Sequence, residues 1–330
     1  MSETSSELPK HLTPLPKFCQ LSSRVWRILG LNPGMFTLQG TNCYLVGSGD
    51  RLVLIDCGEG IPEYIPLLQQ SLQQISPNAY ISDLLITHCH TDHWGGVKDV
   101  LGMDSSINVH KFPATSTAYD GQRFQEIFPS DVELLPLHDD QILKIDDNTT
   151  LRAIHAPGHS SDDCSFWLEE EQALFAGDCV LGYGTTSFDD VAVYINSLEQ
   201  LKALNPRVLY PGHGPVVDDA IGKIQEYIEL RIQRENEILQ VILANPSKPT
   251  WTAYEVTADL WKGKRETHDI RDIHVRGIGL HLKKLGEDGK LKKLDYIDST
   301  LEEKIFLNPW SKPEILKIVW MYTGGLKSQL

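Results

Sequence analysis

The sequence lacks the features that mark membrane and secreted proteins. No apolar run approaches the roughly 20 residues that a membrane-spanning helix needs. The six cysteines include no Cys-x-x-Cys pair, which argues against a disulfide framework and against a zinc ribbon. Residues 1–7 have neither a basic flank nor an apolar core, so they predict no secretory signal and no Arg-rich transit peptide. We expect a cytoplasmic protein with no membrane partner, and the mitochondrial matrix is the alternative.

Positive charge is also scarce. The chain has 30 Lys and Arg against 45 Asp and Glu, a net charge of −15. Because phosphate contacts require Lys and Arg, this balance counts against a general nucleic-acid binder, although a local basic patch would be enough. The 330 residues leave room for one large domain and one small domain, with enough apolar side chains for a sizeable core.

What the sequence does contain is a dense group of metal-ligand side chains. Three histidines and one aspartate fall within six positions, between the apolar run 84–86 and a Gly-Gly pair. The apolar run predicts a buried strand and the glycines predict a turn into a helix, so the ligands lie on a loop at the carboxyl end of a strand. Open α/β sheets collect their ligands at such ends. The four residues are His88, His90, Asp92 and His93.

Three more ligand-type residues follow, each in a Gly-containing turn after an apolar run: His159, Asp178 and His213. Imidazole and carboxylate groups together suit zinc and other first-row metals. We assign one metal to His88, His90 and His159. We assign a second metal to Asp92, His93 and His213, with Asp178 as the bridge. The prediction is a pair of divalent ions, preferably Zn²⁺, with Mn²⁺ or Fe²⁺ as alternatives.

Two such ions about 3.5–4 Å apart would lower the pKa of a bridging water toward neutrality and would polarise a carbonyl or phosphoryl group. The nucleophile is then a metal-bridging hydroxide, and no Ser or Cys nucleophile is needed. Asp92 and Asp178 are the candidate catalytic carboxylates. Two other interpretations are ordinary polar loop residues and a non-catalytic metal site. The second is disfavoured because structural zinc sites are usually closed by Cys-rich ligand sets.

This ordered set resembles the metallo-beta-lactamase superfamily. Residues 32–47, 54–60 and 177–186 resemble its beta-lactamase-like protein 2 group more closely. The resemblance covers about residues 15–295. It implies a four-layer αββα sandwich with the metals at one edge of the sheets, and a small C-terminal winged-helix-like domain. It also implies that Asp56 orients the metal-binding loop from behind the ligands.

Apolar runs and helical spacing predict the organisation of the chain. The expected parts are a loose N-terminal arm (1–20), a catalytic domain (21–220), a winged-helix-like domain (221–298) and a tail (299–330), whose apolar residues have partly helical spacing. The expected strands are 25–29, 43–46, 52–55, 84–86, 151–154, 164–168, 173–175 and 208–210. The expected helices are 63–74, 95–100, 191–204, 223–243, 252–261 and 279–285.

The C-terminal part is locally basic. Residues 248–295 hold eleven Lys and Arg against eight Asp and Glu. Lys283, Lys284 and Lys290 are therefore candidate contacts to nucleic acid or to another partner. The alternative is a solvated face, since charge runs usually face water.

The resemblance leaves the substrate open. One branch of the group is similar to endoribonucleases that cut single-stranded RNA, and this interpretation ranks first. Another branch resembles fungal thioesterases that release a polyketide or acyl group from acyl carrier protein, and this interpretation ranks second. The acidity of the chain counts against RNA binding and brings the two interpretations closer in rank. A non-catalytic scaffold that binds through the winged helix ranks last, because all seven ligands are present. A beta-lactamase activity is not expected, because a fold does not fix a substrate. The oligomeric state is left open.

Overall fold

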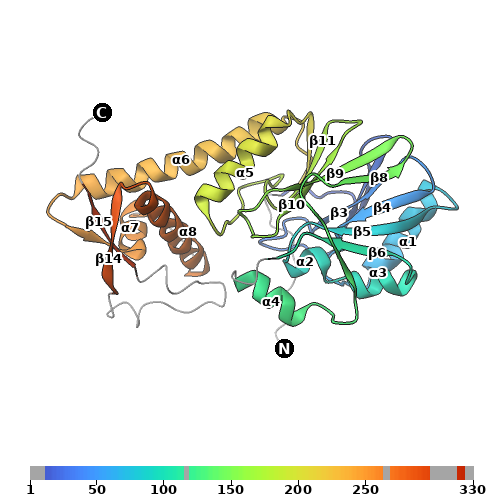
Figure 1. Ribbon diagram of the computed structural model, residues 1–330, viewed down its shortest axis with the longest axis horizontal. Coiled ribbons are helices and arrows are strands. Elements are labelled where there is room, and N and C mark those ends of the chain that lie inside the picture. The colour runs from blue at the N-terminus through green and yellow to red at the C-terminus, as the bar shows by residue number, and fades with distance from the viewer. Residues whose placement is uncertain (1–11, 115–118, 263–267, 298–317, 324–330) are drawn as a thin grey trace. The chain divides into compact units, whose positions relative to one another are not determined.

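The computed structural model describes residues 12–114, 119–262, 268–297 and 318–323 (Figure 1). They belong to two compact units, and the segment 187–195 belongs to the second unit although its neighbours on both sides belong to the first. The first unit comprises 1–186 and 196–225; the second comprises 187–195 and 226–330.

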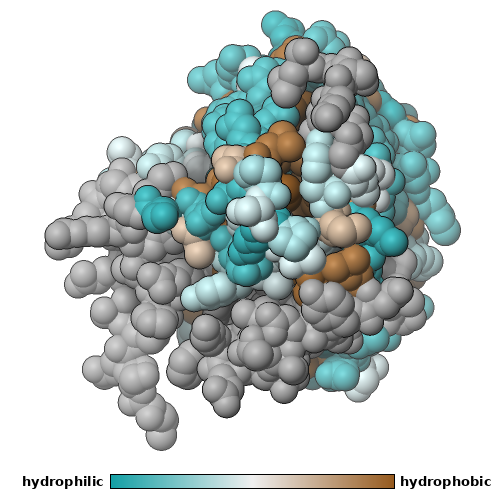
Figure 2. Space-filling view, turned by 90° about the vertical axis from the view of Figure 1, so that its left-hand side faces the viewer, coloured by the Kyte–Doolittle hydropathy of each residue, from teal (hydrophilic) through white to brown (hydrophobic). Residues whose placement is uncertain are grey.

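No helix among the described residues is both long and apolar enough to cross a membrane. Among the coloured residues of Figure 2, hydrophobic side chains form separate groups between hydrophilic ones on the face shown.

The first unit contains a seven-stranded sheet whose strands follow chain order. Neighbouring strands are antiparallel from β1 to β4 and parallel from β4 to β7. In the parallel part, the carboxyl ends of the strands meet at one edge, where a ligand-bearing loop can be held. The strands are β1 (Phe18–Gln20), β2 (Val25–Leu29), β3 (Asn42–Val46), β4 (Arg51–Ile55), β5 (Tyr80–Ile86), β6 (Asn108–Lys111) and β7 (Leu134–Pro136).

Helices cover one face of this sheet. In the first of them, Tyr64, Leu68 and Leu72 are buried at a spacing of four residues, which gives the helix one apolar side. They join a core that also includes Val97 and Phe124 from later helices. The helices are α1 (Tyr64–Ile75), α2 (Thr91–Trp94), α3 (Val97–Met103) and α4 (Tyr119–Ile127).

A second sheet has five strands in the order β12-β11-β10-β9-β8, and only β11 and β12 are parallel. It packs face to face on the first sheet through side chains such as Tyr44, Ile55, Phe166 and Phe175. The strands are β8 (Ile142–Asp146), β9 (Thr149–His155), β10 (Cys164–Leu168), β11 (Ala173–Gly177) and β12 (Val208–Pro211).

Two helices complete the first unit and continue into the second. They are α5 (Val191–Ala203) and α6 (Ala220–Ala244). Within the first unit, α5 and the start of α6 cover the outer face of the five-stranded sheet (Figure 1). The layers are therefore helix, sheet, sheet and helix, which confirms the predicted αββα sandwich.

The second unit combines most of α6 with a three-stranded antiparallel sheet in the order β13-β15-β14. Its helix α7 begins at a capping box, in which Thr252 and Glu255 satisfy each other's backbone N–H groups. Trp251, Leu282 and Trp320 are buried in its core. The remaining elements are β13 (Thr250–Trp251), α7 (Ala253–Leu260), α8 (His268–Glu287), β14 (Leu291–Ile297) and β15 (Ile318–Tyr322).

Two parts of the chain differ from the prediction. The expected N-terminal arm ends in strand β1, which pairs with β2, and Gln39 donates a hydrogen bond to the carbonyl of Thr13 at 2.9 Å. In the tail, residues 318–322 form strand β15, whereas their spacing had indicated a helix. Ile318, Val319 and Trp320 are β-branched or aromatic, and such residues favour strands when a partner strand is available. The rest of the tail lies outside the described residues.

Candidate metal centre

All seven predicted ligands lie at one edge of the two sheets, each just beyond the end of a strand. His88 and His90 follow β5, and Asp92 and His93 lie in the short helix α2. His88 and Cys89 form a bend after β5, and His90, with φ −73° and ψ 137°, precedes the first residue of α2. The other three ligands follow strands of the second sheet: His159 follows β9, Asp178 follows β11 and His213 follows β12.

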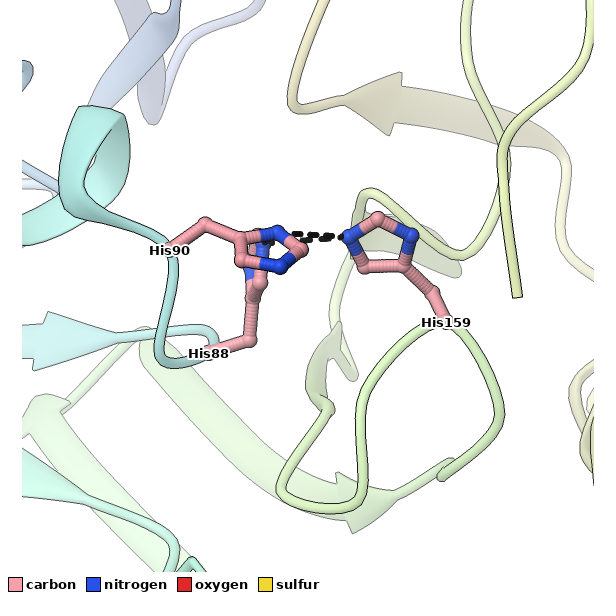
Figure 3. Close-up of side chains that lie close together, drawn as sticks. All are labelled: His88, His90 and His159. Carbon is pink, nitrogen blue, oxygen red and sulfur yellow. Dashed lines mark hydrogen bonds between the residues drawn. The ribbon is translucent and has the colours of Figure 1, made fainter. Parts of the chain in front are cut away.

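One group of donor atoms consists of three imidazole nitrogens. Nδ1 of His90 lies 2.9 Å from Nε2 of His88 and 2.9 Å from Nε2 of His159. The Nε2 atoms of His88 and His159 are 3.3 Å apart. Figure 3 shows His88 and His90, from one loop, facing His159 from another. We call these residues the first trio.

A second group combines two imidazoles with a carboxylate. Nε2 of His93 lies 3.3 Å from Nε2 of His213. Oδ2 of Asp92 lies 3.3 Å from the first of these nitrogens and 3.2 Å from the second. We call Asp92, His93 and His213 the second trio.

Asp178 lies between the trios. Its Oδ1 is 3.5 Å from His93 Nε2 and 3.3 Å from His213 Nε2, whereas its Oδ2 is 3.7 Å from His159 Nε2. Each carboxylate oxygen thus faces a different trio. Oδ1 is buried and accepts no hydrogen bond from any residue that the structure describes. A buried carboxylate oxygen is stabilised by positive charge nearby, from the imidazole of His213 or from a bound divalent ion.

Four of these separations, 3.2–3.3 Å, are close to those around a tetrahedral ion, and the two from His90, 2.9 Å, are shorter. Donor atoms about 2.0–2.2 Å from one tetrahedral ion lie about 3.3 Å or slightly more from each other. The separations within each trio lie between 2.9 and 3.3 Å. The structure therefore groups potential ligands in a way that suits divalent metal binding, with donors of the type expected from the sequence.

Asp56 supports two parts of the ligand loop. Its Oδ1 accepts a hydrogen bond from Thr87 N at 2.8 Å, and its Oδ2 accepts one from Thr87 Oγ1 at 2.9 Å. The same Oδ2 lies 2.7 Å from Nδ1 of His93, on the far side of the ring from the second trio. Because Nδ1 of His93 makes this contact, Nε2 is the ring nitrogen that faces the other donors of the second trio.

Other supporting contacts were not predicted. Thr186 Oγ1 lies 3.0 Å from His159 Nδ1, and Thr87 Oγ1 lies 3.0 Å from His88 Nδ1. Thr41 Oγ1 donates to Asp92 Oδ2 at 3.1 Å. Thr41 and Thr186 both belong to the stretches that carried the family resemblance. Membership of these stretches was the signal in the sequence that could have pointed to both residues.

The pKa shifts of the histidines differ between the two trios. Burial lowers the pKa of His88, and the adjacent rings of His93, His90 and His159 lower it further. At His213, burial also acts to lower the pKa, but the carboxylates of Asp178 and Asp92 outweigh it and raise the pKa to about 9. The second trio thus concentrates negative charge, which favours a bound cation.

The three candidate lysines of the second unit already have carboxylate partners. Lys283 Nζ lies 2.6 Å from Asp190 Oδ2. Lys284 Nζ lies 3.1 Å from Glu235 Oε1, and Asp288 lies 2.9 Å from Lys284 and 3.8 Å from Lys290. Their charge is balanced within the unit, which weakens the case for phosphate contacts.

Comparison with known proteins places the centre in a family. Residues 36–213 match the model of the metallo-beta-lactamase superfamily, a range that includes all seven ligands. The chain belongs to this superfamily. The predicted family resemblance and the predicted enzyme class, a metal-dependent hydrolase, are therefore confirmed.

Relatives extend the match beyond the catalytic unit. The chain is 41% identical over 280 residues to a "Beta-lactamase-like protein 2 homolog" of Caenorhabditis elegans, covering 84% of this chain and 88% of the relative. It is 38% identical over 287 residues to an "Atrochrysone carboxyl ACP thioesterase" of Aspergillus novofumigatus, covering 84% of each chain. A beta-lactamase domain protein from Burkholderia ambifaria has a similar structure, with a TM-score of 0.72, 18% identity and coverage of 95% and 96%.

Proposed function

We propose that this protein is a binuclear metal-dependent hydrolase that cleaves acyl thioesters held on acyl carrier protein. The observation that carries the proposal is the ligand set, two trios with Asp178 between them, in a chain similar to thioesterases over 84% of its length. Zinc is the metal that we propose, because imidazole and carboxylate donors at this spacing suit a tetrahedral ion.

Within the proposal, each side chain has a defined task. The first trio would hold one ion and the second trio would hold the other, and Asp178, which faces both trios, would be shared between them. When bound, the ions would supply an activated water and polarise the carbonyl of the thioester. Asp56 fixes the ring of His93, and Thr186 fixes the ring of His159, so that their Nε2 atoms stay aimed at the ions.

Two observations favour a thioester over single-stranded RNA, which ranked first from the sequence. The thioesterase relatives match 84–85% of the chain, so the match reaches beyond the first unit into the second. The lysines expected to contact phosphates are instead paired with carboxylates. The element order of the second unit, helix, strand, helix, helix, strand and strand, suits the winged-helix-like domain that we continue to propose there.

The test compares both substrates in one preparation. Protein loaded with zinc or manganese is incubated with an acyl-carrier-protein thioester and with single-stranded RNA, alongside Asp178→Asn as the control for contaminating enzymes. We expect the wild type to release free thiol at least a hundredfold faster than the variant. RNA cleavage that is lost in the variant, without thioester cleavage, would contradict the proposal and favour the ribonuclease interpretation.

A further inference from the structure

A buried ion pair joins the two sheets beside the proposed metal centre. Lys111 is the last residue of β6 in the seven-stranded sheet, and Asp162 lies in the loop between β9 and β10 of the five-stranded sheet. Their side chains are 2% and 0% exposed, and Nζ of Lys111 contacts Oδ2 of Asp162. A pair of charges buried so completely is held in one geometry, because neither partner has water as an alternative.

The surroundings of Lys111 fix it further. Its Nζ lies 4.8 Å from the centre of the Phe124 ring and donates a hydrogen bond to the carbonyl of Phe112 at 3.2 Å. Burial lowers the pKa of Lys111 to about 8, so its amine still carries a proton at neutral pH.

The ion pair connects directly to the residue that follows His159. The second oxygen of Asp162, Oδ1, accepts a hydrogen bond from Ser160 Oγ at 2.7 Å. Ser160 is also held by Asp163, whose Oδ2 accepts from Ser160 N at 2.7 Å and whose Oδ1 lies 2.8 Å from the same Ser160 Oγ. A rigid link therefore runs from the seven-stranded sheet through Lys111 and Asp162 to the backbone beside His159.

This link matters because the first trio is divided between the sheets. His88 and His90 follow β5 of the seven-stranded sheet, whereas His159 belongs to the five-stranded sheet. Any sliding of one sheet on the other would change the distances from His159 to the other two nitrogens. A backbone hydrogen bond of 2.9 Å from Cys164 N to Thr87 O also joins the two sheets, where the loop that carries His159 ends.

We propose that Lys111 is a positioning residue for His159, acting through Asp162 and Ser160 to keep the first trio at metal-binding distances. The proposal rests on the metal centre proposed above. It adds a residue from β6, which contributes no ligand, to the groups that set metal affinity. Partners behind the ligands commonly change metal affinity by about 10–100-fold when removed.

The experiment must separate positioning from stability. Loss of one partner of a buried pair leaves an unpaired charge and destabilises the fold, whereas apolar replacement of both partners is often neutral. The variant is therefore Lys111→Met combined with Asp162→Leu. The control is Arg24→Met combined with Glu171→Leu, an ion pair whose side chains are 25% and 16% exposed. That ion pair is 3.3 Å long. It joins Arg24, just before β2, to Glu171 in the turn between β10 and β11, whereas Asp162 lies before the start of β10.

Zinc is titrated into metal-free samples of the wild type and both double variants, and thermal unfolding is recorded for each. We expect the Lys111 variant to fold and to bind one of its two ions about 10–100-fold more weakly, while the control keeps wild-type affinity. Wild-type affinity in the folded Lys111 variant would overturn the proposal.

A single substitution covers the case in which that variant does not fold. Ser160→Ala keeps the ion pair and removes the hydroxyl that contacts both Asp162 and Asp163, while the bond from Ser160 N to Asp163 remains. Weaker binding of one ion supports the positioning role, and unchanged affinity overturns it. Since the readout is metal affinity, a wild type that binds metals but leaves thioesters intact would contradict only the proposed substrate.

Discussion

Nδ1 of His93 lies 2.7 Å from Oδ2 of Asp56, and both side chains are buried. Because one carboxylate also holds the backbone N–H and the hydroxyl of Thr87, it fixes the start of the ligand loop and a ring six residues beyond Thr87. The backbone of Asp56 has φ 57°, a conformation that Asp and Asn adopt more readily than most residues.

Asp56→Asn is predicted to weaken metal binding by about 10–100-fold without unfolding the protein. Asn tolerates the positive φ but replaces one carboxylate oxygen with an N–H₂ group, so one of the contacts to Thr87 and His93 is lost. Metal titration of the purified variant measures the effect. Asp140→Asn is the matched control, since Asp140 also has a positive φ, 58°, and its side chain is 72% exposed. Equal losses in both variants would contradict the role of Asp56.

Removal of metal is predicted to abolish activity and to lower the unfolding temperature. Ligands that bind only the folded state stabilise it by about 2.7 kcal/mol at one hundred times their dissociation constant. Elemental analysis of active protein should find about two divalent ions per chain, because two trios with a shared carboxylate exceed the needs of one tetrahedral ion. Only trace metal in active protein would refute the metal centre.

Charge reversal at the paired lysines should affect stability, and more at one position than at the other. Lys284 and Glu235 have side chains that are 18% and 9% exposed, whereas those of Lys283 and Asp190 are 40% and 30% exposed. We expect Lys284→Glu to destabilise the protein by about 1–3 kcal/mol and Lys283→Glu by at most about 1 kcal/mol. Denaturant unfolding measures both.

The same variants test the RNA interpretation. If these lysines contact phosphates, each lost contact should flatten the salt dependence of RNA binding by about 0.7 in log–log slope. We expect no such change, because carboxylates already occupy the lysines.

His281 is predicted to make the second unit sensitive to acid. It is buried, and burial lowers its pKa below the usual value near 6.5, an effect that Glu235 only partly opposes. Because the unfolded chain takes up this proton at a higher pH than the folded chain, stability falls as the pH drops below about 6.5. In His281→Gln, the difference in unfolding free energy between pH 7.5 and pH 5.5 should be smaller than in the wild type. An identical difference would exclude His281 as the source.

The sequence predicted a group of side chains that the structure brings together, because these side chains follow strong local patterns. Apolar runs located β5, β11 and β12, and the predicted ligands lie just beyond them. The supporting contacts could not be predicted in the same way. Thr186 and His159 are 27 residues apart, and nothing in either segment indicates that their side chains meet.

The sequence does not indicate which charged residues are buried or paired. Lys111 resembles an ordinary surface lysine in the sequence, yet it is buried, because its partner comes from a loop of the other sheet. Lys283 and Lys284 suggested a basic surface, but Asp190 and Glu235, far away in the chain, balance them. Strand β7 ends in Pro136 and is only three residues long, so its apolar pattern is too short to be recognised.

The position of His213 has a consequence for the growing chain. It is the last of the seven ligands and follows β12, the edge strand that pairs with β11. A ribosome-bound chain that ends before residue 213 lacks one donor of the second trio and part of the five-stranded sheet. The proposed centre can therefore form on a nascent chain only after nearly all of the first unit has been synthesised.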